Sequence, residues 1–153
     1  ELTLFTNGNI TSSRSFPVGT LRLLNHDVSH KTWMELKTWV KNTCGKHEAI
    51  TAIGTGGNVT KIFKMVENKK GKTICLKDIK KIHHELSMLT FNERIEKFSL
   101  NKDRADVIVP AGKIITSIMK WGNIKDLHVP KLGMADGLVH LMHQKHIELT
   151  SSN

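Results

Sequence analysis

The sequence predicts an α/β domain whose mixed sheet opens with a β-hairpin and is flanked by helices. Two extended runs, residues 2–6 and 9–16, are separated by Asn7 and Gly8, and an Asn-Gly pair between strands is the strongest short hairpin signal. Beyond the hairpin, segments of helical periodicity alternate with short apolar runs. This alternation favours helices packed on a sheet.

The first long helix is expected to begin after Ser29, whose hydroxyl can accept a hydrogen bond from the first turn. Trp33, Leu36 and Val40 recur at helical spacing and form one apolar stripe, which should pack on the sheet. Gly45 is expected to end the helix in a left-handed conformation.

A strand, a glycine loop and a helix follow. Residues 48–53 form a short apolar run, which Gly-Thr-Gly-Gly-Asn at 54–58 interrupts before helical spacing resumes at Val59. A basic, polar stretch at 67–72 is expected to be a loop. The next helix is predicted over 76–89, and its outer face carries Lys77, Lys80 and Lys81.

The C-terminal half is expected to be mostly helical. Thr90 and Glu93 can form a capping box that starts a short helix. The run 106–121 is apolar nearly all round, with Pro110 and Gly112 early in it, which predicts a buried core helix. The remaining elements are a strand at 127–129, a loop at 131–135 and a closing helix at 136–146.

Size and composition predict one soluble domain, residues 1–149, with a frayed tail at 150–153. No run approaches the ~18 apolar residues of a membrane span, so we expect no membrane partner. Cys44 and Cys75 form no CxxC pair and no disulfide framework, which favours a cytoplasmic location.

The charge favours a polyanionic partner. The chain has 23 Lys and Arg against 14 Asp and Glu, a formal net charge of +9. Either nucleic acid or polyphosphate would satisfy it, although many basic domains bind neither. Trp33, Trp39 and Trp121 lie at core-like spacings instead of forming a basic aromatic platform, which disfavours nucleic acid.

The loop at 54–58 is the best candidate binding site. A glycine turn between a strand and a helix directs free backbone N–H groups and the helix dipole at one point, where an anion can bind. The string is neither GxGxxG with a ribose-binding acid nor a P-loop. A tight turn without a ligand therefore fits the spacing equally well.

Four segments in order carry a family resemblance: Phe-Pro-Val-Gly-Thr-Leu-Arg-Leu at 16–23, the glycine loop at 52–60, Arg-Ala-Asp-Val-Ile-Val-Pro-Ala-Gly at 104–112 and Gly-Met-Ala-Asp-Gly-Leu at 133–138. With them the chain closely resembles, over nearly its whole length, the second domain of the exopolyphosphatase and guanosine pentaphosphatase family. The resemblance implies an actin-like ATPase (ribonuclease H-like) fold. It also implies a hydrolase that cleaves terminal phosphoanhydride bonds of polyphosphate or guanosine pentaphosphate.

The resemblance further implies that part of the enzyme is absent from this chain. In the family this domain begins with a strand and a glycine-rich loop ending in Ser-Thr-Glu, and Glu1 resembles the last residue of that loop. The first strand, the first domain and the carboxylate that activates water would lie upstream, so we expect this chain alone to be inactive. The uncovered sheet edge should be filled by a rearranged sheet, a strand of a second copy in a homodimer, or the missing part of the same protein.

The family's site residues can be carried over to a few positions. Glu1 would be a catalytic or metal-binding acid, although it could equally be a disordered terminus. Arg104 would bind phosphate, although it could instead pair with Asp103 or Asp106 at a helix start. The resemblance implies a divalent cation, expected to be magnesium, as cofactor. The phosphate- or nucleotide-binding residues would be Gly54, Thr55, Gly56, Gly57, Asn58 and Arg104.

Two other functions fit parts of the pattern. A phosphotransferase of the same fold, such as a sugar or acetate kinase, could use the glycine loop to hold adenosine. A nucleic-acid-binding module would follow from the +9 charge alone.

Overall fold

The structure, a computed structural model, describes residues 1–130 and 132–151. It opens with the predicted hairpin of β1 (Leu2–Thr6) and β2 (Asn9–Arg14), paired antiparallel. Asn7 and Gly8 both have positive φ, 53° and 78°, as the turn of a two-residue hairpin requires. The Asn-Gly signal is confirmed.

The central sheet is mixed and has the order β3-β5-β4. Its strands are β3 (Ala52–Ile53), β4 (Thr73–Cys75) and β5 (Asp126–His128), with β3 parallel and β4 antiparallel to β5. The predictions did not include β4, because it is three residues long and follows a basic loop. The buried Ile74 anchors it to the core.

The hairpin and the central sheet are two separate sheets. The predicted mixed sheet is present, but β1 and β2 do not extend it. Among the described strands, none pairs with the outer edge of β1 or of β3. Both edges therefore keep unpaired backbone groups.

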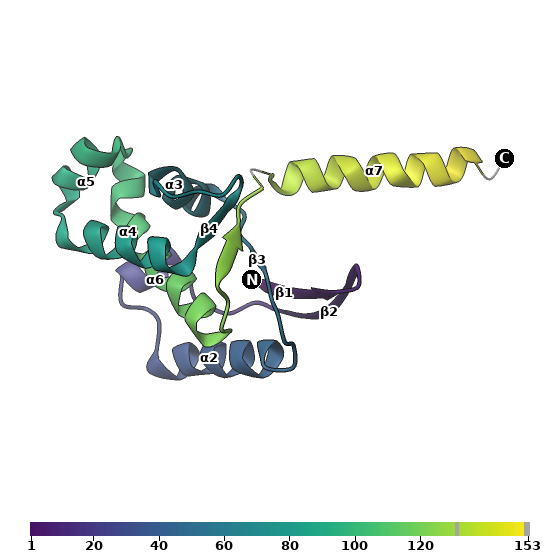
Figure 1. The fold of residues 1–153 in the computed structure, drawn as a ribbon, viewed down its shortest axis with the longest axis horizontal. Helices are drawn as coiled ribbons and strands as arrows, with labels where there is room; N and C mark the ends of the chain where they lie inside the picture. Colours follow the sequence, from purple (N-terminus) through teal and green to yellow (C-terminus); the bar gives the residue numbers. More distant parts are fainter. Residues whose placement is uncertain (131, 152–153) are drawn as a thin grey trace.

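Helices cover the central sheet and make up most of the domain (Figure 1). All predicted helices are present, and the short α1 is additional. The closing helix extends further than predicted and includes residues 150 and 151, whereas residue 131 of the predicted loop and 152–153 of the predicted tail lie outside the described residues. The helices are α1 (Thr20–Leu24), α2 (His30–Cys44), α3 (Gly57–Met65), α4 (Leu76–Met88), α5 (Phe91–Phe98), α6 (Lys102–Trp121) and α7 (Met134–Ser151).

Local capping signals explain where α2 and α5 begin. The Ser29 hydroxyl accepts a hydrogen bond from the Thr32 N–H at 3.1 Å, and Thr90 and Glu93 form the full capping box. The prediction for Gly45 was wrong, because its φ of −63° is right-handed. Glycine is needed there for close packing instead: an added Cβ would lie 2.7 Å from the Lys41 carbonyl oxygen.

Helix α6 is the centre of the core and contacts α1, α2, α3, α4 and α5. It begins at Lys102, four residues before the predicted start at 106, and continues through Pro110. Gly112 allows the His83 ring to pack against the α6 backbone, and burial lowers the pKa of His83. Buried apolar side chains of α6 and of the elements around it form the core: Ile62, Ile74, Ile79, Leu86, Ala105, Ile108, Met119, Leu127 and Val129.

Helix α7 projects from the body of the molecule (Figure 1). Its apolar side chains are exposed, including Leu138, Leu141, Met142 and Leu149. No helix among the described residues has the length and apolar character needed to cross a membrane.

Candidate phosphate-binding site

The glycine loop connects the end of β3 to the start of α3. The Gly54 N–H donates to the His128 carbonyl at 2.8 Å and so continues the pairing of β3 with β5. An added Cβ at Gly54 would lie 2.6 Å from Val59 Cγ1, so only glycine fits between strand and helix. Gly56 has φ +100°, a conformation that favours glycine. Packing and backbone geometry thus fix the turn that precedes α3.

The first turn of α3 is not capped by a side chain. Its N-cap is Gly56, which has no side chain to offer, and the intrahelical bonding starts with the Thr60 N–H donating to the Gly56 carbonyl at 3.0 Å. The preceding N–H groups of a first turn have no intrahelical acceptor. Together with the positive end of the helix dipole they can bind an anion.

Arg104, near the start of α6, reaches this turn across 46 positions of sequence. Its Nη1–H donates to Asn58 Oδ1 at 2.9 Å, and both side chains are half-buried. The guanidinium lies over Gly57, where an added Cβ would overlap both Nη atoms. A glycine at position 57 is therefore needed for arginine to occupy this place.

The electrostatics of this arrangement favour an anion. A guanidinium and the positive end of a helix are brought together, and neither charge is neutralised by the protein. Among the described residues, no carboxylate lies within 4.0 Å of Arg104, so it does not form the alternative ion pair with Asp103 or Asp106. A phosphate oxygen placed here would be attracted by the backbone N–H groups and the guanidinium together.

The loop and Arg104 are thus brought together, whereas Glu1 is not part of the group. Glu1 is exposed, and in the described part of the chain no hydrogen bond or ion pair joins it to residues 54–58 or to Arg104. The contact between Asn58 and Arg104 was not foreseen. Both residues were predicted as phosphate contacts, but no local pattern indicates that one holds the other.

The glycine loop at 54–58 and Arg104 offer no carboxylate to a metal ion. In residues 1–130 and 132–151, no three His, Cys, Asp or Glu side chains are grouped as metal ligands. Magnesium is commonly held by one or two carboxylates, water and substrate phosphate, and in the described part of the chain no hydrogen bond or ion pair joins Glu1 to the glycine loop. We therefore derive no catalytic step through a metal ion from these residues.

Among the described Asp and Glu side chains, the pKa shift falls on Glu93, which lies outside the candidate site. The backbone and side-chain hydrogen bonds from Thr90 lower the pKa of Glu93, which caps α5. Glu93 is therefore committed to the capping box and is not a candidate general acid.

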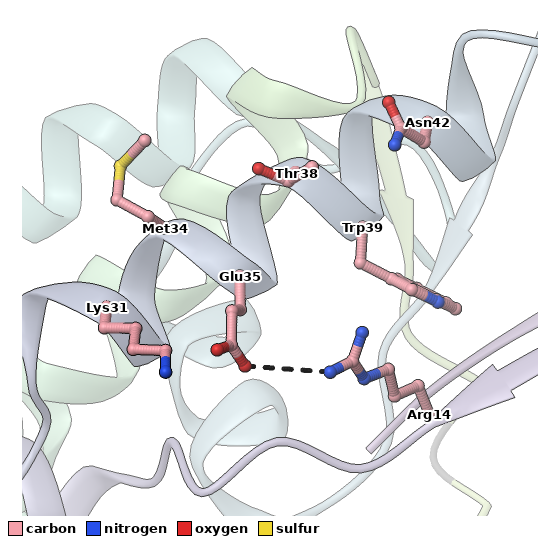
Figure 2. A pocket seen from close by; sticks show the side chains of 7 residues that line it. All are labelled: Arg14, Lys31, Met34, Glu35, Thr38, Trp39 and Asn42. Atoms are coloured by element: carbon pink, nitrogen blue, oxygen red, sulfur yellow. Dashed lines mark ion pairs between the residues drawn. The ribbon is translucent and has the colours of Figure 1, made fainter.

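A separate cavity of about 420 Å³ lies between β2 and α2 (Figure 2). Figure 2 shows the Arg14 side chain pointing toward Glu35, and the two form an ion pair at 3.7 Å. Arg14 also lies 4.8 Å from the centre of the Phe16 ring. Because a carboxylate and an aromatic ring already engage Arg14, this cavity has the character of packing between hairpin and helix. None of the predicted site residues line it.

Solved structures share this architecture. The chain matches the crystal structure of a Ppx/GppA family member from Aquifex aeolicus with a TM-score of 0.71 and 17% identity, covering 93% of this chain and 52% of that one. It matches an exopolyphosphatase from Cytophaga hutchinsonii with a TM-score of 0.70 and 17% identity, covering 92% and 52%. These structures have the actin-like ATPase fold, which confirms the predicted fold class.

This chain spans about half the length of those solved relatives, 52% in both. No curated protein sequence matches it significantly. The sequence model of the Ppx/GppA phosphatase family matches residues 1–146, and the chain therefore belongs to that family.

Proposed function

We propose that the intact protein hydrolyses the terminal phosphoanhydride bond of inorganic polyphosphate or of guanosine pentaphosphate. The observation that carries this proposal is the guanidinium of Arg104 held over the uncapped first turn of α3. Family membership supports it, as does the fold shared with a structure described as an exopolyphosphatase.

The role we assign to these residues is electrostatic. Phosphoryl transfer requires positive groups and N–H donors around the transferring phosphoryl group. The backbone N–H groups at Gly57 and Asn58 would hold phosphoryl oxygens, and Arg104 would bind a neighbouring oxygen through its planar fork. Asn58 would fix the guanidinium in place by accepting one of its hydrogen bonds.

Other parts of the reaction are assigned to groups beyond this cluster. We propose that a carboxylate upstream activates the attacking water, so that this chain alone is inactive. A divalent cation, expected to be magnesium, would neutralise phosphoryl oxygens in the intact protein, and Glu1 is the candidate ligand from the family resemblance. We also propose a cytoplasmic location, in keeping with two free cysteines, Cys44 and Cys75.

We further propose that this domain associates with the missing part of the same protein or with a second copy. The unpaired edges of β1 and β3 and the exposed apolar side chains of α7 support this. Size-exclusion chromatography with light scattering would test it. A stable monomer of this chain alone, with unchanged secondary structure, would contradict it.

The function is tested by phosphate release from polyphosphate and from guanosine pentaphosphate, measured on the intact protein and on Arg104→Ala. We expect turnover to fall at least about tenfold, roughly 1.4 kcal/mol, with a nearly unchanged melting temperature. Arg104→Lys should restore only part, because lysine lacks the planar fork.

Unchanged turnover in Arg104→Ala would remove Arg104 from the site. If the intact protein releases no phosphate and instead transfers a phosphoryl group to a sugar or acetate acceptor, the kinase alternative is favoured. The exposed Lys64→Gln, which removes one positive charge from the far end of α3, is the matched control and should keep normal turnover.

A further inference from the structure

A second cavity, lined by lysines, lies at the end of the central sheet opposite the glycine loop. It has a volume of about 520 Å³ and is lined by the start of α4, the end of α6 and the segment leading into β5. Four of its nine lining residues are lysines, and none is acidic. The lysines are Lys77, Lys80, Lys120 and Lys125.

This cavity is distinct from the glycine-loop site. Lys125 immediately precedes β5, whereas the glycine loop follows β3, which runs parallel to β5. The Gly54 N–H bonds to His128, at the opposite end of β5 from Lys125. Figure 1 likewise places the end of α6 and the start of α3 near opposite ends of this strand.

The fold brings the four lysines to the wall of one cavity, and no acidic residue lines it. The Leu76 N–H donates to the Lys125 carbonyl at 2.8 Å, which joins the start of α4 to the segment before β5. In residues 1–130 and 132–151, none of the four lysines forms an ion pair within 4.0 Å. Asp78, the acid in the first turn of α4, accepts a hydrogen bond from the Cys75 thiol. Four like charges thus converge from two distant segments of the chain.

A purely structural role does not explain all four positions. Lys120 lies in the last turn of α6, where the helix dipole favours a cation. Lys77, by contrast, lies in the first turn of α4, where the dipole disfavours cations, and Lys80 follows it one turn later. A polyanion bound in the cavity would attract these lysines. This attraction would offset both the unfavourable interaction with the helix dipole and the repulsion among the lysines.

The residues that line the cavity favour a phosphate chain as its ligand. Its floor is apolar and rigid, since Met119 is 1% and Ile124 5% exposed, so the lysine side chains surround a fixed surface. No aromatic side chain lines it, and it therefore lacks the stacking platform on which proteins bind single-stranded nucleic acid. The four lysines are exposed and line one open cavity, and several ammonium groups along one cavity match several linked phosphoryl groups better than a single phosphate.

We propose that this lysine-lined cavity binds a linear oligophosphate anion at a site separate from the glycine loop. The proposal does not depend on the hydrolytic activity. It goes beyond the proposed function because these lysines lie away from Arg104 and the start of α3.

Isothermal titration of inorganic tripolyphosphate into the intact protein tests the proposal. EDTA prevents turnover, and Arg104→Ala as the common background disables the other site. Adding Lys80→Gln with Lys120→Gln should weaken binding at least tenfold, about 1.4 kcal/mol. The control, Lys64→Gln with Lys145→Gln, removes the same charge from exposed positions outside the cavity and should change affinity less than about threefold.

Equal weakening in the two double variants would mean that only net charge matters and would overturn the proposal, as would unchanged affinity in both. If orthophosphate binds as tightly as tripolyphosphate, the cavity is a site for a single anion and the proposal of an oligophosphate site is overturned. Single-stranded DNA of equal phosphate concentration that binds more tightly, through the same lysines, would overturn it in favour of nucleic acid. Because hydrolysis is not measured, failure here is distinguishable from failure of the proposed function.

Discussion

Helices α5 and α3 begin in contrasting ways. At α5 the Thr90 N–H donates to the Glu93 carboxylate at 2.7 Å and the Glu93 N–H donates to the Thr90 hydroxyl at 3.4 Å. At α3 the N-cap is a glycine without a side chain, and a guanidinium is added to the positive end of the helix. A side chain of the protein satisfies the start of α5, whereas no side chain caps the start of α3. The first arrangement stabilises the fold, and the second is suited to bind a ligand.

The largest expected effect concerns the core that supports both helices. Ile108, in α6, is fully buried, and Ile108→Ala should lower the free energy of unfolding by about 2–5 kcal/mol. Chemical denaturation measures this change. Activity per folded molecule should be retained at low temperature, because Ile108 belongs to the apolar core and offers no polar group to a ligand. A loss of activity without loss of stability would show that core and site are not separable as we describe.

A smaller effect is expected at the cap of α5. Thr90→Ala removes the hydroxyl that accepts from the first turn and should cost about 1 kcal/mol of stability. Turnover should stay normal, since α5 satisfies its own first turn and contributes no residue to the candidate site. Thermal melting and kinetics of the same preparation would measure the stability and the turnover. An altered turnover would contradict the assignment of α5 to stability and of α3 to ligand binding.

The smallest effect is a pH dependence of the same cap. Hydrogen bonds from Thr90 lower the pKa of Glu93, so the ionised carboxylate stabilises the folded state above the ordinary carboxyl pKa. This contribution is lost as the pH falls through the lowered pKa. Between about pH 6 and pH 3, the melting temperature should therefore fall more in the wild type than in Glu93→Gln. Parallel curves for the two proteins would contradict the capping role.

Much of the fold was predictable because its signals are local. The Asn-Gly turn, the Ser29 cap and the Thr90–Glu93 box each depend on a few neighbouring residues. Helix α1 has no side-chain cap and strand β4 has three residues, so neither produces a periodic pattern. Gly45 was misassigned because a sequence does not distinguish a glycine needed for positive φ from one needed for close packing.

The site was predictable only in part. The turn chemistry of residues 54–58 is local and suggests an anion, but the approach of Arg104 depends on how α6 packs beside α3. Their contact joins residues 46 positions apart, and only tertiary structure creates it. That contact explains why glycine is needed at position 57, because the guanidinium occupies the space that a Cβ would fill.

Gly57→Ala tests the central claim most directly, since it changes the start of α3 without removing a charge. The added methyl group should displace the guanidinium from its place over the first turn. We expect kcat/KM of the intact protein for polyphosphate or guanosine pentaphosphate to fall at least about tenfold. The free energy of unfolding should change by less than about 1 kcal/mol, because alanine favours a helix and the displaced group is the end of a flexible side chain. An unchanged kcat/KM would contradict the account of an anion site built from α3 and Arg104.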